Sequence, residues 1–351
     1  MKNIKMIFKF IKQKLQDNIN GYFYAIVSNV LRSTIFPYQV KKKKYFQINS
    51  NFFHPEVTID TIGLCNAKCK FCSYRISDRP KEIISLETYK KWANQAIELG
   101  FTRLNLTPIN GEFFLNKNYS DIIKFSREIG FSKVRTFTNA VNFEKIDLDL
   151  IFDKKYGLTT LSISTGGFDK KNYEECFGIK KYDQFMKGLL LVLQYFDKKR
   201  PNINLSIELR SNKTLKENLN TSDFLNNIKK YYDKKLFNIE QINYFDSWAG
   251  QVKQEDLPKG MKLGPKPLIQ KRNCHRLYTL GILYDGVVRL CNCRYQGGDI
   301  TNDGLYLGNL NSEGLDKILQ SHLISKIRNE FSNSTPDVCK NCQFYIPAVL
   351  K

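Results

Sequence analysis

The run Val57-Thr-Ile-Asp-Thr-Ile-Gly63, followed by Leu64 and then Cys65-Asn-Ala-Lys-Cys69-Lys-Phe-Cys72, decides the fold of this chain. Residues 57–63 are rich in β-branched side chains and predict a strand. The cysteines after it, spaced four and three residues apart, can surround one corner of an iron–sulfur cubane, and three such ligands leave one iron open. A zinc site is the poorer interpretation, because it needs a fourth Cys or His nearby and His54 precedes the strand.

From residue 57 to about 250 the sequence alternates between strand and helix patterns. The first helix, 86–99, is marked by Ser85 as its N-cap and by Gly100 just past its end. Repeated strand–helix units indicate parallel strands with helices outside, and six such strands can form an open, partial barrel whose chemistry lies at the C-terminal strand ends. The other expected helices are 119–129, 181–196 and 224–232; the expected strands are 57–63, 101–108, 134–139, 158–165, 203–210 and 239–245.

Residues 274–351 have a different character. Apolar runs at 280–284 and 287–290 flank Asp285-Gly286, a strong hairpin signal, and a helix is expected over 315–331. The sequence therefore predicts an α/β protein in three parts. These are an N-terminal appendage (1–50), a core with a partial TIM-type barrel (51–255), and a small C-terminal domain of a β-hairpin plus a helix (256–351).

The composition fits a protein that binds metal in a reducing compartment. Nine cysteines occur among 351 residues, and all but Cys176 fall within 65–72 or 274–342. Cytoplasmic thiols stay reduced, so metal or redox chemistry explains them better than disulfides do. No run reaches the roughly 18 apolar residues of a membrane span, and no signal peptide is recognised, so a cytoplasmic location is expected.

The net charge is +21, which favours anionic partners such as nucleic acid, an acidic membrane surface, nucleotide-linked sugars or acidic peptides. A general abundance of lysine explains the same excess equally well. Near the N-terminus, Ile4, Phe8, Ile11 and Leu15 recur at helical spacing between lysines. This basic amphipathic helix either lies on the inner membrane surface or packs on the main domain.

The Cys-x3-Cys-x2-Cys motif after a first strand, with the aromatic Phe71 before its third cysteine, resembles the radical S-adenosylmethionine (SAM) superfamily over about residues 55–250. The resemblance implies a partial (β/α)6 barrel with a [4Fe–4S] cluster on Cys65, Cys69 and Cys72. In this family SAM chelates the open iron, and reductive cleavage yields methionine and a 5′-deoxyadenosyl radical that takes hydrogen from a substrate. The cofactor carries that chemistry, whereas the protein orients and shields it.

The resemblance extends to residues expected to bind SAM. Gly111 and Glu112 match a Gly-Gly-Glu-Pro motif that meets the SAM amino group, although Asn110 and Phe113 depart from it. Ser162 and Ser164 lie where relatives offer a hydroxyl. Phe177-Gly178 stands in place of an Arg-Gly pair, so Arg210 is the candidate for the missing charge toward the SAM carboxylate. Trp248 either lines the pocket or packs in the core.

The remaining cysteines form a second set. Cys274, Cys291, and the terminal Cys339-Lys-Asn-Cys342 indicate a four-cysteine metal site, for which zinc is also suitable. Asp285-Gly-Val-Val-Arg-Leu-Cys291 resembles the Gly-x4-Cys turn of the auxiliary-cluster domains called SPASM and twitch. The low cysteine count favours the twitch form, with one auxiliary [4Fe–4S] cluster. Cys293 is the alternative ligand to Cys291, and a buried structural thiol is expected for Cys176.

Taken with the resemblance, these features favour a radical SAM dehydrogenase or epimerase acting on a sugar, aminosugar or cyclitol, with a reducing protein such as flavodoxin or ferredoxin as partner. The proton-accepting base stays unidentified, and a structural role is expected for His275. A peptide or protein maturase is the alternative, although residues 1–50 look too short for a peptide-recognition domain. A non-enzymatic electron-transfer or nucleic-acid-binding protein is a further alternative, disfavoured by Gly111-Glu112 and the barrel pattern.

Overall fold

The computed structural model describes residues 26–27, 38–40, 56–242, 244–267, 270, 272–292, 300–331 and 333–350. The amphipathic helix expected near the N-terminus and Cys293 lie outside these ranges. In the described part of the chain, no helix is long and apolar enough to cross a membrane.

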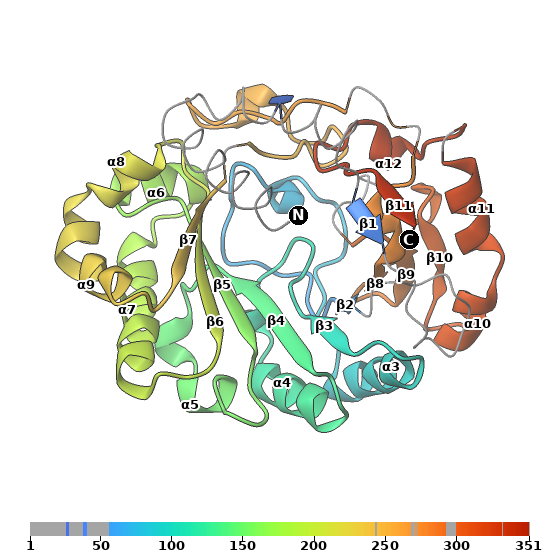
Figure 1. Ribbon diagram of the computed structural model, residues 1–351, viewed down its shortest axis with the longest axis horizontal. Coiled ribbons are helices and arrows are strands. Elements are labelled where there is room, and N and C mark those ends of the chain that lie inside the picture. Colours follow the sequence, from blue (N-terminus) through green and yellow to red (C-terminus); the bar gives the residue numbers. More distant parts are fainter. Residues whose placement is uncertain are drawn as a thin grey trace.

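A curved sheet of nine strands in the order β10-β9-β8-β2-β3-β4-β5-β6-β7 organises the molecule. Strands β2 to β7 are mutually parallel, with helices outside them, which confirms the predicted partial barrel (Figure 1). The strands are β2 (Glu56–Ile59), β3 (Arg103–Asn105), β4 (Lys133–Thr138), β5 (Thr160–Thr165), β6 (Asn204–Leu209), β7 (Asn238–Gln241), β8 (Leu280–Ile282), β9 (Val287–Leu290) and β10 (Tyr306–Asn309).

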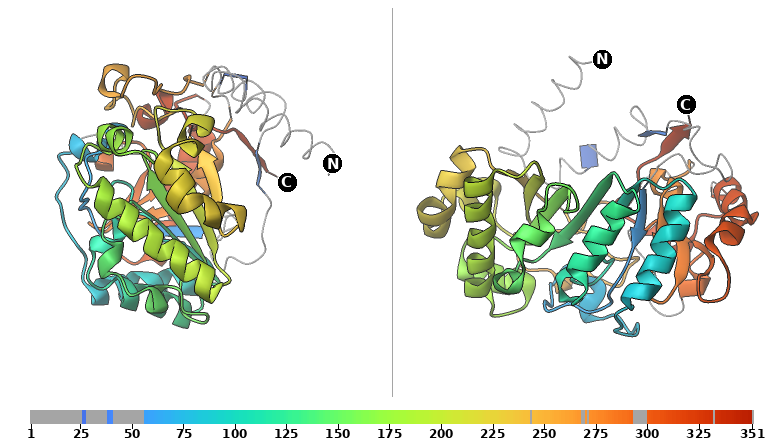
Figure 2. Two further views of the ribbon diagram at one scale, coloured as in Figure 1. Left: turned by 90° about the vertical axis from the view of Figure 1, so that its left-hand side faces the viewer. Right: turned by 90° about the horizontal axis from the view of Figure 1, so that it is seen from below.

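Helices follow the strands along the outer face of the sheet, and the C-terminal helices lie at the far end from α7 to α9 (Figure 2). Ser85 caps α3 through its hydroxyl, as predicted, and Gly100 follows it with φ +93°. The helices are α3 (Leu86–Glu98), α4 (Tyr119–Glu128), α5 (Leu148–Ile151), α6 (Lys170–Phe177), α7 (Tyr182–Lys199), α8 (Leu215–Leu219), α9 (Lys229–Asp233), α10 (Leu315–Gln320), α11 (Leu323–Glu330) and α12 (Asp337–Lys340).

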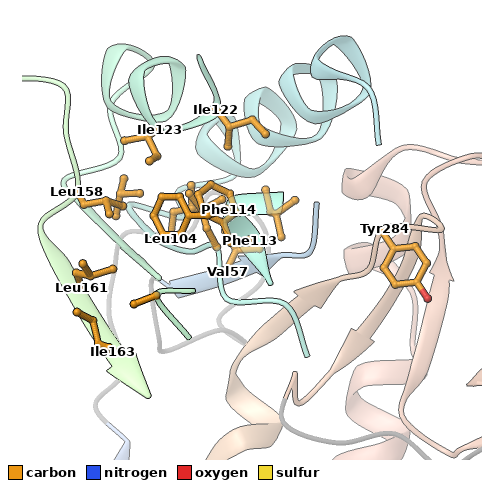
Figure 3. Close-up of a cluster of buried hydrophobic side chains, with 14 of the residues drawn as sticks. Val57, Leu104, Phe113, Phe114, Ile122, Ile123, Leu158, Leu161, Ile163 and Tyr284 are labelled. Carbon is orange, nitrogen blue, oxygen red and sulfur yellow. The ribbon is translucent and has the colours of Figure 1, made fainter. Parts of the chain in front are cut away.

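Alternation along the strands sends apolar and polar residues to opposite faces. The outward residues, among them Val57, Leu104 and Leu161, join phenylalanines 113 and 114 and helix residues such as Ile122 in a buried cluster (Figure 3). The inward residues are polar, and the register aligns Thr58 with Asn105, and Ser164 with Glu208. The barrel interior is therefore a polar surface rather than the packed layers of bulky branched side chains usual in closed barrels.

The predicted C-terminal hairpin exists as β8 and β9, and it continues the barrel sheet, because β8 pairs in parallel with β2. A two-stranded sheet of β1 (Tyr38–Val40) and β11 (Ala348–Leu350) lies beside it. The domain boundaries proposed from the sequence stay predictions.

Two predicted helices differ in detail from the structure. The helix expected over 315–331 is two helices, since Ser321 takes an extended conformation with ψ 152° and ends α10. The helix expected over 224–232 begins as a π-helical turn (Phe224–Ile228) before α9.

Candidate active site

The first three cysteines lie on a loop that closes at its base. Gly63 N donates to Glu82 O at 2.8 Å and Ile84 N to Thr61 O at 3.1 Å, so backbone hydrogen bonds join the two ends of the loop that follows β2. We call this loop, residues 64–82, the cluster loop. Cys65, Cys69 and Cys72 are half-buried and line one cavity of about 960 Å³. Burial, followed by the nearby Glu112 carboxylate, raises the pKa of Cys65 to about 12. Thiolate ligands here would therefore need the positive charge of bound metal.

The cluster loop rests on the C-terminal end of α6. Lys68 N donates to Phe177 O at 3.1 Å, and Lys70 N to Cys176 O at 3.0 Å. Gly178 has φ +64°, and a Cβ there would lie 2.4 Å from Lys68 O, so the close approach of two backbones requires glycine. The Phe177-Gly178 pair thus supports the loop through its backbone.

Aromatic side chains hold the other side of the loop. Phe71 stacks on Phe245 with ring centroids 5.1 Å apart and meets Phe177 edge-on. The indole Nε1 of Trp248 donates to Phe71 O at 2.9 Å. Trp248 is 7% exposed and also borders the cavity, so both of its expected roles, pocket lining and packing, are combined.

Glu112 is a buried carboxylate that reaches the cavity. It is 3% exposed, and its oxygens accept from Thr138 Oγ1 at 2.8 Å and from Asn139 N at 2.8 Å. Burial raises its pKa to about 7, and these hydrogen bonds oppose the rise. A Cβ on Gly111 would lie 2.7 Å from Ile62 O, so only glycine lets Glu112 approach the cluster loop this closely. Glu112 is therefore not an ordinary carboxylate of a solvent-exposed loop.

Sequence reasoning missed an asparagine network that joins Glu112 to the cluster loop. Asn139, whose N–H binds Glu112, donates from Nδ2 to Asn66 Oδ1 at 2.6 Å, and Asn66 Nδ2 donates to Asn142 Oδ1 at 3.2 Å. Asn66 directly follows Cys65, and Asn139 follows β4. The position of Asn139 at the C-terminal end of a parallel strand could have marked it as a candidate site residue.

The other predicted SAM-binding residues are placed unequally. Ser164 and Arg210 line the cavity with the cysteines, and Arg210 is paired with Glu208 at 2.7 Å. Ser162 instead forms a 2.8 Å hydroxyl hydrogen bond with Ser206 and is 6% exposed. Its hydroxyl is already engaged within the sheet.

The cavity has a mixed electrostatic character, unlike the strongly basic chain. Its walls carry both signs: Arg135, Arg210 and Arg276, and Glu112, Glu208, Glu240 and Asp246. The C-terminal unit contributes His275, Asn292 and Tyr345. His275 Nδ1 lies 3.4 Å from Ile346 O, a contact that suits a structural histidine. The lining therefore gives no preference for anions.

Two cysteines of the second set, Cys291 and Cys339, lie near a buried ion pair. Arg289 and Asp303 pair with both side chains 0% exposed, and Arg289 also donates to the carbonyl of Cys291. Burial raises the pKa of Cys339 to about 12. Cys274, Arg289 and Asp303 also influence this pKa through their charges. Cys342 N donates to Cys339 O at 3.2 Å. Within the described ranges, no three His, Cys, Asp or Glu side chains gather closely enough to hold a single metal ion.

Asp60, at the end of β2, is a buried acid that sequence reasoning did not single out. Its Oδ2 accepts from Ile109 N at 3.3 Å, while Oδ1 has no hydrogen-bond partner among the described residues. Burial raises its pKa to about 7, which Arg79 and Arg289 oppose and Asp285 reinforces. Arg79 and Asp285 themselves form an ion pair that joins the cluster loop to the β8–β9 turn.

This raised pKa predicts a pH-dependent stability. Between the unfolded pKa of about 3.9 and the folded pKa near 7, the folded state holds a proton that the unfolded state has lost, so stability falls as pH rises through this window. Asp60→Asn removes the effect. Urea unfolding at pH 6 and pH 8 should show the wild type losing about 1.4 kcal/mol relative to the variant. An unchanged difference between the two proteins would contradict the assignment.

Comparison with known proteins agrees with this geometry. Residues 59–234 match the model of the radical SAM superfamily, and residues 274–343 match SPASM, an iron–sulfur cluster-binding domain. The chain therefore belongs to the radical SAM superfamily, and its cofactors are SAM and [4Fe–4S] clusters.

Curated relatives and solved structures show how far the likeness extends. GTP 3′,8-cyclase of Mannheimia succiniciproducens is 26% identical over 170 residues, which cover 47% of this chain and 46% of that protein. The Haemophilus ducreyi enzyme of the same name is 26% identical over 130 residues, covering 36% and 37%. The chain thus matches less than half the length of these relatives.

Among structures, BtrN in complex with AdoMet and 2-DOIA has a TM-score of 0.52 at 16% identity, covering 82% of this chain and 92% of that one. Streptococcus suis SuiB bound to precursor peptide SuiA has a TM-score of 0.54 at 15% identity, covering 84% and 71%. At such identities these likenesses show the fold alone.

Proposed function

We propose that this radical SAM enzyme oxidises or epimerises a hydroxyl-bearing small molecule: a sugar, an aminosugar or a cyclitol. The observation that carries the proposal is that the cluster-loop cysteines and a polar barrel wall line the same cavity, of about 960 Å³. Hydroxyl, amide, carboxylate and guanidinium groups on that wall can pair with the many donors and acceptors of a polyol.

We infer that Cys65, Cys69 and Cys72 hold the SAM-binding [4Fe–4S] cluster. The residues fit SAM: Gly111 leaves room beside the loop backbone, and the Glu112 carboxylate, fixed by Thr138 and Asn139, is suited to accept hydrogen bonds from an ammonium group. Ser164 and Arg210, which line the cavity, are our candidates for contacting a ribose hydroxyl and a carboxylate, while Ser162 supports the wall through its hydrogen bond to Ser206. When bound and reduced, these cofactors supply a 5′-deoxyadenosyl radical that abstracts hydrogen from the substrate.

We assign Cys274, Cys291, Cys339 and Cys342 to one auxiliary [4Fe–4S] cluster, which would serve as the electron acceptor in an oxidation. The buried Arg289–Asp303 pair supports this assignment, because it fixes the backbone of Cys291 and lies in electrostatic range of Cys339. A cytoplasmic flavodoxin or ferredoxin would supply the reducing electrons.

A peptide maturase is the second candidate, favoured by the fold it shares with SuiB, which was solved with a precursor peptide. GTP is a further test compound, since the curated relatives are GTP 3′,8-cyclases.

Screening the anaerobically reconstituted protein separates these candidates. We expect sugars, aminosugars or cyclitols to raise the rate of 5′-deoxyadenosine formation at least about tenfold above the substrate-free rate, because bound substrate consumes the radical productively. Peptides and GTP serve as the comparison sets. Stimulation by peptides or by GTP alone would contradict the proposed substrate class.

A further inference from the structure

Asn292 reaches the barrel cavity from the C-terminal unit. It follows Cys291 at the end of β9, and the pairing of β8 with β2 brings this segment against the barrel wall. A Cβ on Gly281, in β8, would lie 3.0 Å from the Cβ of Asn292, so glycine at this position lets the side chain pass over the strand. Asn292 lines the same cavity as the three cluster-loop cysteines.

The backbone before Asn292 is held in an unusual conformation. Cys291 has φ +58°, which is unfavourable for a residue with a side chain. The buried Arg289–Asp303 pair stabilises it, since Arg289 donates to the Cys291 carbonyl. A conformation maintained in this way fixes the direction in which Asn292 leaves the strand.

The amide of Asn292 is anchored on one side only. Its Nδ2 donates to Thr58 Oγ1, which also accepts from Asn105 Nδ2 at 3.2 Å. Both polar atoms of the Asn105 amide have a partner, because its Oδ1 accepts from Thr107 N at 3.1 Å. Asn292 Oδ1, by contrast, is buried and has no hydrogen-bond partner among the described residues.

We propose that the carbonyl oxygen of Asn292 binds substrate, accepting a hydrogen bond from a substrate hydroxyl or ammonium group. A buried acceptor without a donor is unfavourable, and a bound donor would satisfy it. The identity of that donor as part of a sugar, aminosugar or cyclitol rests on the proposed function. The contact would place the polar end of the substrate one residue from Cys291, the assigned auxiliary-cluster ligand.

Stability of the substrate-free protein tests the proposal without a known substrate. Asn105 and Asn292 are matched, since both bind Thr58 and line the cavity, but only Asn105 has a partner for both its amide oxygen and its amide nitrogen. Asn105→Leu should lower Tm by about 3–6 °C, whereas Asn292→Leu should change it by less than about 2 °C. Equal losses would overturn the proposal, because they would make Asn292 a structural amide.

Calorimetric titration of the SAM-loaded protein with myo-inositol, glucosamine and UDP-glucose gives the second measurement. For a probe that binds the wild type, Asn292→Leu should weaken binding about tenfold, while Asn292→Asp, which keeps an acceptor, should restore it. Wild-type affinity in Asn292→Leu, at unchanged iron content, would leave a bound water as the partner of Oδ1 and overturn the proposal. If no probe binds the wild type, the proposed substrate class fails, and the Tm comparison alone decides the role of Asn292.

Discussion

Replacing Cys65, Cys69 and Cys72 together with alanine is expected to abolish formation of 5′-deoxyadenosine from SAM. The three thiols are the cavity's cluster ligands in our assignment, and without them neither electron delivery to SAM nor chelation of SAM remains. The loss should exceed a thousandfold and bring the reduced protein to the background rate. Chromatography of acid-quenched reactions measures it.

A matched cysteine variant controls for general damage. Cys176 is fully buried beneath the cluster loop and lies outside the cavity lining, so Cys176→Ala should retain cleavage within a few-fold. Persistent SAM cleavage in the triple variant would contradict the assignment of the cluster to Cys65, Cys69 and Cys72.

Replacing Cys339 and Cys342 with alanine is expected to halve the iron content, from about eight to about four irons per chain. Substrate conversion should stop, because the electron acceptor is lost, while SAM cleavage without substrate continues at the cluster loop. The Cys65/Cys69/Cys72 variant should show the complementary result, with about four irons and no cleavage. Iron and acid-labile sulfide assays on both reconstituted variants measure this.

Zinc analysis of the wild type decides the nature of the second site. About four irons with one zinc would remove the electron-accepting role of the C-terminal unit. Redox-neutral chemistry, such as epimerisation with a thiol as hydrogen donor, would then be the better proposal.

Local patterns in the sequence predicted the barrel well, because each signal acts within a few residues. Ser85 and Gly100 delimited α3 through capping, and Asp285-Gly286 marked the β8–β9 turn. The same reasoning did not predict that β8 would pair with β2, since that contact joins residues more than two hundred positions apart. The periodic pattern of apolar residues also did not predict that the helix ends at Ser321, because this break is a change of backbone conformation within a continuous apolar pattern.

The candidate site shows the same division between local and distant information. The cysteine spacing and Gly111-Glu112 pointed to residues that the fold does bring to one cavity. Asn139, Asn66 and Asn292 were not predicted, because an asparagine acquires its role only from the partners that distant segments supply. The net charge of +21 was a poor guide to the cavity, whose lining contains both carboxylates and guanidinium groups.

The most direct test of radical SAM chemistry in this protein uses the wild type, reconstituted anaerobically with iron and sulfide, reduced, and mixed with SAM. We expect equal amounts of 5′-deoxyadenosine and methionine, formed only in the presence of reductant and only with the cluster on Cys65, Cys69 and Cys72 in place. Reduced protein that carries that cluster, binds SAM and yet forms no 5′-deoxyadenosine would contradict it.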